Sequence, residues 1–183
     1  MIDKHELRAR MRAERKRLAG LDAGAAMRAA EQIADLPPGD LVAVYRAIGS
    51  ELDAEPVSVA LTHAGRALCL PVVITRDEPM VFRRWSPGEP LELDAIGVPA
   101  PLPLAEAVEP DLILTPLLAF DLDGGRLGQG GGYYDRTFAA LSHATRVGLA
   151  YAGQRVDDLP VEGHDVRLHG VLTETGYTAA RKV

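Results

Sequence analysis

"DLILTPLLAFDLDGGRLGQGGGYYDR", residues 111–136, places an apolar run, a glycine-rich turn and a helical pattern in direct succession. The run at 112–118 is apolar almost throughout, which is typical of a strand covered on both faces. Beyond the glycines, Tyr134, Phe138 and Leu141 recur at the spacing of one helix face. A buried strand that leads through a turn into a helix is the repeating unit of parallel α/β sheets.

The rest of the chain repeats this alternation. Short apolar runs bounded by Gly, Pro or Asp predict strands at 41–45, 67–73, 112–118, 146–151 and 170–174. Helical patterns lie at 3–19, 24–35, 54–64 and 132–142. Residues 79–85 predict an antiparallel edge strand, and the proline-rich segment 97–110 an ordered surface connection. We therefore predict a three-layer α/β/α fold with a mostly parallel central sheet, in one domain over residues 1–183.

Composition excludes several classes of protein. The 183 residues are 47% hydrophobic and 25% charged, as in ordinary globular proteins. The net charge of -6 argues against a general nucleic-acid surface, and no apolar run is long enough to span a membrane. The opening segment is too charged for a signal peptide, so we expect a cytoplasmic protein. The lone Cys69 excludes an internal disulfide and multi-cysteine metal sites, and its apolar setting predicts a buried, inert thiol.

Six of the 18 glycines lie between positions 124 and 132. A strand, a glycine-rich turn and a helix N-terminus form a natural phosphate site, because unpaired N–H groups and the helix dipole favour an anion there. Neither the P-loop nor the Rossmann pattern matches. A flexible surface loop is the alternative, but Arg126, Tyr133, Tyr134 and Asp135 make the stretch chemically richer than such a loop requires.

The first helical pattern carries a second signal. With Lys4 at zero on the helical wheel, Arg8 and Arg15 fall at about 40° and 20°, and the apolar Leu7 and Met11 at about 300° and 340°. The basic stripe therefore borders the apolar stripe, where its cations would point into a cleft and neutralise phosphates. A solvated charged face is the alternative interpretation.

Two further features follow strand ends. Glu51 lies in a turn after the strand at 41–45, a position that often lines the ligand crevice of parallel α/β folds. His164 and Asp165 lie in the turn-rich stretch 159–170. These two residues form no metal signature unless another carboxylate joins them, and Asp135 is the candidate.

Together these residues resemble the family of 5-formyltetrahydrofolate cyclo-ligases, also called 5,10-methenyltetrahydrofolate synthetases. The family's pattern R-L-G-x-G-x-G-Y-Y-D runs without a gap from Arg126 to Asp135. The opening K-x-x-L-R, the turn at Glu51, and the stretches "FRRWSPGEPL", "PDLILTPLLAFD" and "LPVEGHDVRLHGVLTE" are also similar to it.

The resemblance implies ATP- and magnesium-dependent conversion of 5-formyltetrahydrofolate to 5,10-methenyltetrahydrofolate, with release of ADP and phosphate. ATP phosphorylates the formyl oxygen, N10 attacks the activated carbon, and phosphate departs. The resemblance also implies these roles by position: ATP-binding for Lys4, His5, Glu6, Leu7, Arg8, Arg126, Leu127, Gly128, Gln129, Gly130, Gly131, Gly132, Tyr133 and Tyr134; folate-binding for Arg46, Glu51, Gln129, Gly130, Gly131, Gly132 and Tyr133; Mg²⁺-binding for Asp135 and Asp165.

Three positions depart from the family pattern. Gln129 replaces an aromatic or basic residue, His169 a common Asp, and Ala100 a common Glu. Two other readings stay open at this point: a non-catalytic nucleotide-binding module, and a sugar-phosphate isomerase of similar layout. We expect a monomer with small-molecule substrates and no nucleic-acid or membrane partner.

Overall fold

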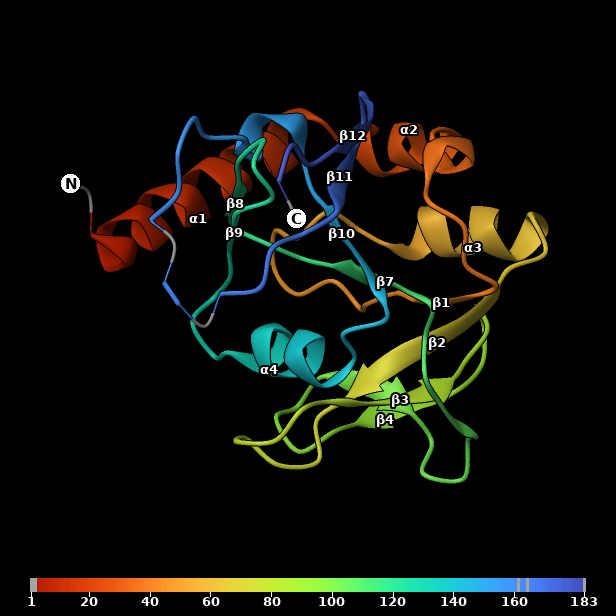
Figure 1. Cartoon of the computed structure of the whole chain (residues 1–183). Coiled ribbons are helices and arrows are strands. Elements are labelled where there is room, and N and C mark those ends of the chain that lie inside the picture. The colour runs from red at the N-terminus through yellow and green to blue at the C-terminus, as the bar shows by residue number, and fades with distance from the viewer. Residues whose placement is uncertain (1–2, 161, 164, 183) are drawn as a thin grey trace.

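The computed structural model describes residues 3–160, 162–163 and 165–182. Its centre is an eight-stranded sheet of order β12-β11-β10-β7-β1-β2-β3-β6 (Figure 1). The strands of this sheet are β1 (Leu41–Ala43), β2 (Ala67–Val72), β3 (Val81–Arg84), β6 (Ala107–Val108), β7 (Leu112–Thr115), β10 (Thr145–Leu149), β11 (Gly170–Thr173) and β12 (Gly176–Ala179).

Smaller elements complete the fold. Two two-stranded sheets are formed by β4 (Leu91–Leu93) with β5 (Pro99–Pro101), and by β8 (Ala119–Phe120) with β9 (Arg126–Leu127). The helices are α1 (Lys4–Leu21), α2 (Ala25–Glu31), α3 (Glu55–His63) and α4 (Tyr133–Ala140), with short 3₁₀ turns η1 (Ile33–Asp35) and η2 (Ala152–Gln154).

The centre of the large sheet is parallel. β11, β10, β7, β1 and β2 pair in parallel from neighbour to neighbour, and they are the five strands that the apolar runs predict. Three antiparallel strands, β12, β3 and β6, extend the edges. The predicted strand at 79–85 is β3, antiparallel as expected, but it is not the edge because the two-residue β6 pairs outside it. The prediction of a mostly parallel central sheet is confirmed.

Both faces of this sheet are buried, which explains the uninterrupted apolar runs. Along β1 and β7, alternate residues join two separate cores: Val42 and Leu112 pack with α2 and α3, whereas Ala43 and Ile113 pack with Phe138 of α4. Figure 1 shows α2 and α3 on one side of the sheet and α4 on the other. Cys69 belongs to the α4 side, and burial raises the pKa of its thiol to about 12, as the prediction of an inert thiol requires.

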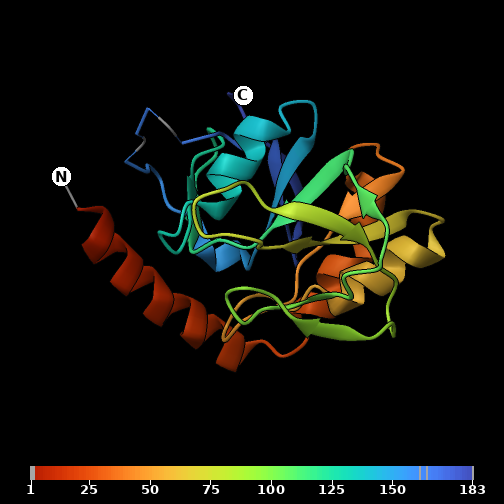
Figure 2. The same cartoon turned by 90° about the horizontal axis from the view of Figure 1, so that it is seen from below.

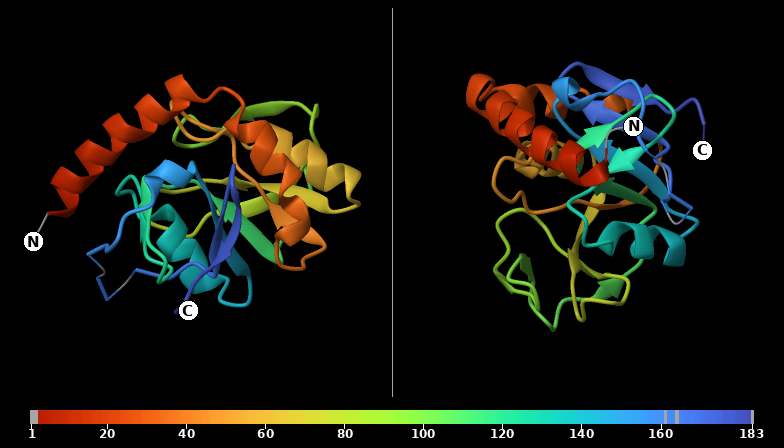
Figure 3. Two further views of the ribbon diagram at one scale, coloured as in Figure 1. Left: turned by 90° about the horizontal axis from the view of Figure 1, so that it is seen from above. Right: turned by 90° about the vertical axis from the view of Figure 1, so that its left-hand side faces the viewer.

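Helix α1 is the longest of the described helices, and Leu18 and Ala19 near its C-terminal end pack against the core on the side of α2 and α3. It runs along one side of the molecule, and its first turns approach the segment that contains residue 165 (Figures 2 and 3). Its apolar stripe, including Leu7 and Met11, packs against Leu118 and Leu127 near the β8–β9 hairpin. None of the described helices has the combination of length and apolar character that crossing a membrane demands.

Candidate active site

The site lies where the topology of the sheet changes direction. From β1 the chain crosses through α3 to β2 on one side, and from β7 it crosses through α4 to β10 on the other. Because α3 and α4 cover opposite faces, the segments that follow β1 and β7 diverge and leave a crevice between them. A cavity of about 310 Å³ is found there, and α1 and the β4–β5 hairpin complete its walls.

Most of the predicted site residues line this one cavity. From the ATP set these are Lys4, Arg8 and residues 126–134, from the folate set Arg46 and Glu51 as well, and from the metal set both Asp135 and Asp165. Three residues of the ATP set do not line it: His5 and Glu6 are exposed, and Leu7 is buried in the apolar contact of α1.

The glycine loop owes its path to backbone conformations that side chains disfavour. Gly130 and Gly132 have φ values of +104° and +71°, in the left-handed region. Gly132 is also the N-cap of α4, and a Cβ there would lie 2.6 Å from the Arg136 guanidinium. The loop therefore delivers the chain into the first turn of α4 with its unpaired N–H groups at the cavity, which is the arrangement expected of a phosphate site.

The start of α1 is tied to this loop and to the segment 162–165. Arg8 Nε donates to the Gly128 carbonyl at 3.1 Å. Lys4 Nζ lies 2.7 Å from Asp165 Oδ2 and 3.1 Å from Glu162 Oε2. The basic stripe thus points into the cavity, as the helical wheel predicts, and is not a solvated face.

Arg126 and Asp135 form a second ion pair on the cavity wall. Arg126 Nη2 lies 3.0 Å from Asp135 Oδ1, and the Arg126 side chain is only 5% exposed. The guanidinium also lies over the rings of Tyr134 and Phe138, at 5.7 and 5.6 Å from their centroids. Among the described residues its Nε has no hydrogen-bond partner. A buried cation with an unused donor is suited to an anionic ligand.

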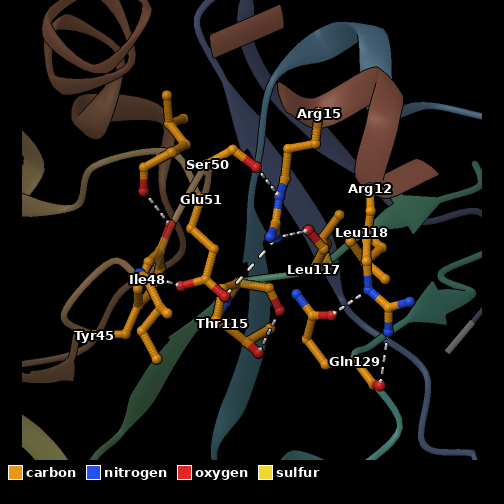
Figure 4. Close-up of polar contacts among 12 residues, drawn as sticks. Arg12, Arg15, Tyr45, Ile48, Ser50, Glu51, Thr115, Leu117, Leu118 and Gln129 are labelled. Atoms are coloured by element: carbon orange, nitrogen blue, oxygen red, sulfur yellow. Dashed lines mark hydrogen bonds and ion pairs between the residues drawn. The ribbon is translucent and has the colours of Figure 1, made fainter. Parts of the chain in front are cut away.

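Arg46 and Glu51 also line the cavity. Arg46 lies over the Trp85 ring at 5.7 Å and forms an ion pair with Glu55. Glu51 is more buried, and Figure 4 shows its carboxylate between the Ile48 backbone and Arg15 of α1. Burial raises the pKa of Glu51, while the Ile48 N–H and the Arg15 charge oppose that rise.

Two carboxylates fit the chemistry of a magnesium ion at this cavity. Asp135 and Asp165 offer hard oxygen donors on its wall. Within the described part of the chain no group of three or more His, Cys, Asp and Glu side chains could hold a metal. Mg²⁺ commonly binds through one or two carboxylates together with substrate phosphates. His164, the neighbour of Asp165, lies outside the described residues.

Sequence reasoning missed an apolar wall of the cavity. It is built by the end of β2, the residue before β3 and the β4–β5 hairpin, and its members are Pro71, Val73, Met80, Ile96, Val98 and Pro99. Asp94 holds the hairpin in place, because its carboxylate accepts the N–H groups of Val73, Ile96 and Val98 at 3.0 Å each. An Asp that precedes a tight turn was the available signal. The proline-rich segment is ordered, as predicted, but it also forms part of the site.

Comparison with known proteins identifies the family that this chain resembles in sequence. A model of the 5-formyltetrahydrofolate cyclo-ligase family matches residues 1–174. The chain is 35% identical to 5-formyltetrahydrofolate cyclo-ligase of Escherichia coli K12 over 158 residues, which span 79% of this chain and 85% of the relative. The Mycolicibacterium smegmatis cyclo-ligase is 33% identical over 154 residues, 78% of each chain.

Solved structures agree. The structure of 5,10-methenyltetrahydrofolate synthetase from Aquifex aeolicus covers 98% of this chain and 94% of its own, with a TM-score of 0.76 at 29% identity. The synthetase from Mycoplasma pneumoniae shares the fold, with a TM-score of 0.75 at 24% identity over 94% of this chain and 99% of that one. With the family model matching nearly the whole sequence and the curated relatives aligned over most of it, the chain belongs to the 5-formyltetrahydrofolate cyclo-ligase family.

Proposed function

We propose that this cavity binds ATP and 5-formyltetrahydrofolate side by side and converts the folate to 5,10-methenyltetrahydrofolate, with release of ADP and phosphate. The observation that carries the proposal is the convergence of two chemically different walls on one glycine loop. Cations from α1 and β9, the side chains of Glu51 and Arg46, and the apolar wall all line one cavity together with residues 128–134.

The cationic side suits the triphosphate. Lys4, Arg8 and Arg126 come from two elements and meet beside the N-terminus of α4, where the helix dipole also favours negative charge. In this arrangement the cations contact Asp165, the Gly128 carbonyl and Asp135. Phosphate oxygens are stronger partners for Arg8 than a backbone carbonyl is, and a triphosphate also offers anionic oxygens to Lys4 and Arg126. We therefore expect ATP to draw these side chains onto its phosphates.

Asp135 and Asp165 are the residues that we expect to hold Mg²⁺. When bound, the ion would supply neutralisation of the charge on the phosphates during transfer. The two aspartates begin in contact with Arg126 and Lys4, at 3.0 and 2.7 Å. Their availability as oxygen donors therefore depends on those cations turning toward the nucleotide.

The other side suits an aromatic, polar-edged substrate. The wall of Val73, Met80, Ile96 and Val98 offers an apolar surface to flat rings, while Glu51 offers a carboxylate to ring N–H groups. Burial and the neighbouring Glu51 charge raise the pKa of the Tyr134 hydroxyl, so it stays neutral and able to donate a hydrogen bond.

The chemistry then follows from position. The formyl oxygen is a poor leaving group, so it attacks the γ-phosphorus of ATP, the bond to the ADP oxygen breaks, and the phosphorylated carbon becomes electrophilic. N10 attacks that carbon and closes the ring, the C–O bond to phosphate breaks, N10 gives up its proton to solvent, and inorganic phosphate leaves with the former formyl oxygen. Phosphoryl transfer requires mainly alignment and charge stabilisation, which the glycine loop and Arg126 are placed to give.

An absorbance assay for methenyltetrahydrofolate, run with and without ATP, tests the proposal. We expect product to appear only when ATP, Mg²⁺ and 5-formyltetrahydrofolate are all present, with one ADP formed per product. Product in the absence of nucleotide, or ADP formation without folate at the same rate, would overturn it. A monomeric state and a cytoplasmic location stay predictions, which gel filtration and cell fractionation would test.

A further inference from the structure

Arg15 of α1 is a buried cation that the folate-binding proposal does not use. Only 4% of the residue is exposed, although it belongs to a helix whose other arginines lie at the surface or the cavity rim. We infer that Arg15 is a positioning residue for substrate: it holds the Glu51 carboxylate at the folate side of the cavity. This inference rests on the proposed function and names a further residue on which that site depends.

The Arg15 guanidinium joins three segments that are distant in the sequence. Its Nε donates to Ser50 Oγ at 3.2 Å, and its Nη1 donates to the Leu117 carbonyl at 3.0 Å. The same Nη1 lies 3.8 Å from Glu51 Oε1. Figure 4 shows the guanidinium between the 48–51 turn and the segment after β7. Arg15 therefore contacts both Ser50 and Glu51, two adjacent residues of this turn.

The two oxygens of Glu51 have different partners. Oε2 accepts the Ile48 N–H at 2.9 Å, which closes the turn. Oε1 faces Arg15 at a distance too long for a direct hydrogen bond, so it keeps the capacity to accept one from a substrate N–H while the cation fixes its direction. The side chains of Arg15 and Glu51 are 5% and 8% exposed, so water does little to screen this pair.

The charge on Glu51 also depends on Arg15. The ionisable groups that interact with this carboxylate are Arg15 from α1, Tyr45 after β1 and Tyr134 from α4. Tyr45 is buried and Tyr134 is partly buried, and the raised pKa of each hydroxyl keeps it neutral, so Arg15 is the cation among these groups. Burial raises the Glu51 pKa and Arg15 lowers it. Loss of Arg15 would therefore leave a carboxylate that holds its proton to higher pH and accepts hydrogen bonds less well.

A purely structural role for Arg15 makes a different prediction. The same helix carries Lys4 and Arg8, so if Arg15 only docked α1, its loss would disturb the ATP side of the cavity. The Leu117 carbonyl does not depend on Arg15 alone, because Gln154 Nε2 donates to it at 2.8 Å. The folate and ATP responses of an Arg15 variant thus separate the two roles.

The experiment compares Arg15→Met, Arg15→Lys, Glu51→Gln and the double variant Arg15→Met/Glu51→Gln. Arg17→Met is the matched control, since Arg17 is an exposed arginine of α1 that pairs with Glu14. KM and kcat are measured for each substrate, with the pH profile of kcat/KM for 5-formyltetrahydrofolate and the thermal midpoint of each variant.

We expect Arg15→Met to raise the folate KM about tenfold, the range of coupled neighbours, and to leave the ATP KM within about twofold. The acid limb of its pH profile of kcat/KM for 5-formyltetrahydrofolate should move to higher pH. Arg15→Lys should recover part of the loss in folate binding. In the Glu51→Gln background Arg15→Met should add little to the folate KM. The double variant should also melt above Arg15→Met, because it no longer buries an unpaired carboxylate.

Equal rises in the ATP and folate KM values, multiplicative effects of the two substitutions, or an unmoved acid limb would overturn the inference. If Arg15→Met does not fold, Arg15→Lys and its double variant with Glu51→Gln give the same comparison. Failure of the proposed function has a separate signature: the unmodified enzyme and Arg17→Met would then form no methenyl product, while the thermal midpoints would still report whether Arg15 and Glu51 are coupled.

Discussion

Gly132→Ala is the most direct test of the glycine loop. Gly132 has φ +71° and ψ 6°, a left-handed conformation that disfavours any side chain by about 1–2 kcal/mol. A Cβ there would also lie 2.6 Å from Arg136 Nη1, so this side chain would have to move away from the loop. Arg136 now donates from Nη2 to the carbonyls of Arg76 and Gly131, at 2.7 and 3.0 Å, and its displacement would loosen both segments.

The free-energy cost of Gly132→Ala can appear in the stability of the fold, in ligand binding, or in part in each. If the loop keeps its conformation, Gly132→Ala lowers the free energy of unfolding by about 1–2 kcal/mol. If the loop relaxes, the protein avoids that strain when free but must restore the strained conformation to bind ligand. The loss then appears in binding, as a roughly 5- to 30-fold rise in KM for ATP and folate. The two losses should sum to about the same total.

Urea unfolding and steady-state kinetics measure both parts. Gly20→Ala is the matched control, because Gly20 lies in α1 with no heavy atom near the position of an added Cβ. That variant should gain about 0.5–1 kcal/mol of stability and keep both KM values. If Gly132→Ala matches the unmodified enzyme in stability and in both KM values, the left-handed loop is not required and the reasoning fails.

Three further predictions concern charges. Lys4→Ala and Arg8→Ala should weaken ATP binding about ten- to hundredfold, since charge-assisted hydrogen bonds contribute about 1.5–3 kcal/mol, and should change folate binding less; calorimetry that gives unchanged ATP affinity contradicts the role of the basic stripe. Asp135→Asn and Asp165→Asn should each raise the Mg²⁺ concentration needed for half-maximal turnover and leave the thermal midpoint nearly unchanged, so a titration with the original midpoint refutes the metal assignment. Burial and Arg146 lower the pKa of His169, so the folded protein should lose stability as pH falls below the usual value of 6.5; thermal melts of His169→Gln should show a weaker loss over that range, and an identical pH dependence would exclude His169 as the cause.

The sequence was most informative where burial leaves a continuous pattern. The five parallel strands are apolar on both faces, and that is why their runs stood out without any alternation. The strands that sequence reasoning did not predict are short or half-exposed. β6, β8 and β9 have two residues each, and β4 is mostly exposed, so neither a hydrophobic run nor a period of two can mark them.

The candidate site also has one part that the sequence predicts and another that it does not. The glycine loop and the basic stripe could be predicted because each concentrates unusual residue types within a few positions. Arg15 lies on the same stripe as Lys4 and Arg8, yet its burial beneath the 48–51 turn depends on how α1 packs against the segment after β7. Helical periodicity gives the direction of a side chain, and tertiary packing decides which partner it meets.

The ion pairs of the cavity explain how an acidic protein can bind a highly charged nucleotide at one place. Lys4 faces Asp165 and Arg126 faces Asp135, and both cations are largely buried, with side chains 14% and 5% exposed. A buried charge left without a partner is strongly unfavourable. A magnesium nucleotide carries both signs of charge, so we expect its phosphates to take the cations while its metal takes the carboxylates. Each buried charge then exchanges one partner for another, and a chain of net charge -6 can hold a polyanion in this cavity without a general affinity for polyanions.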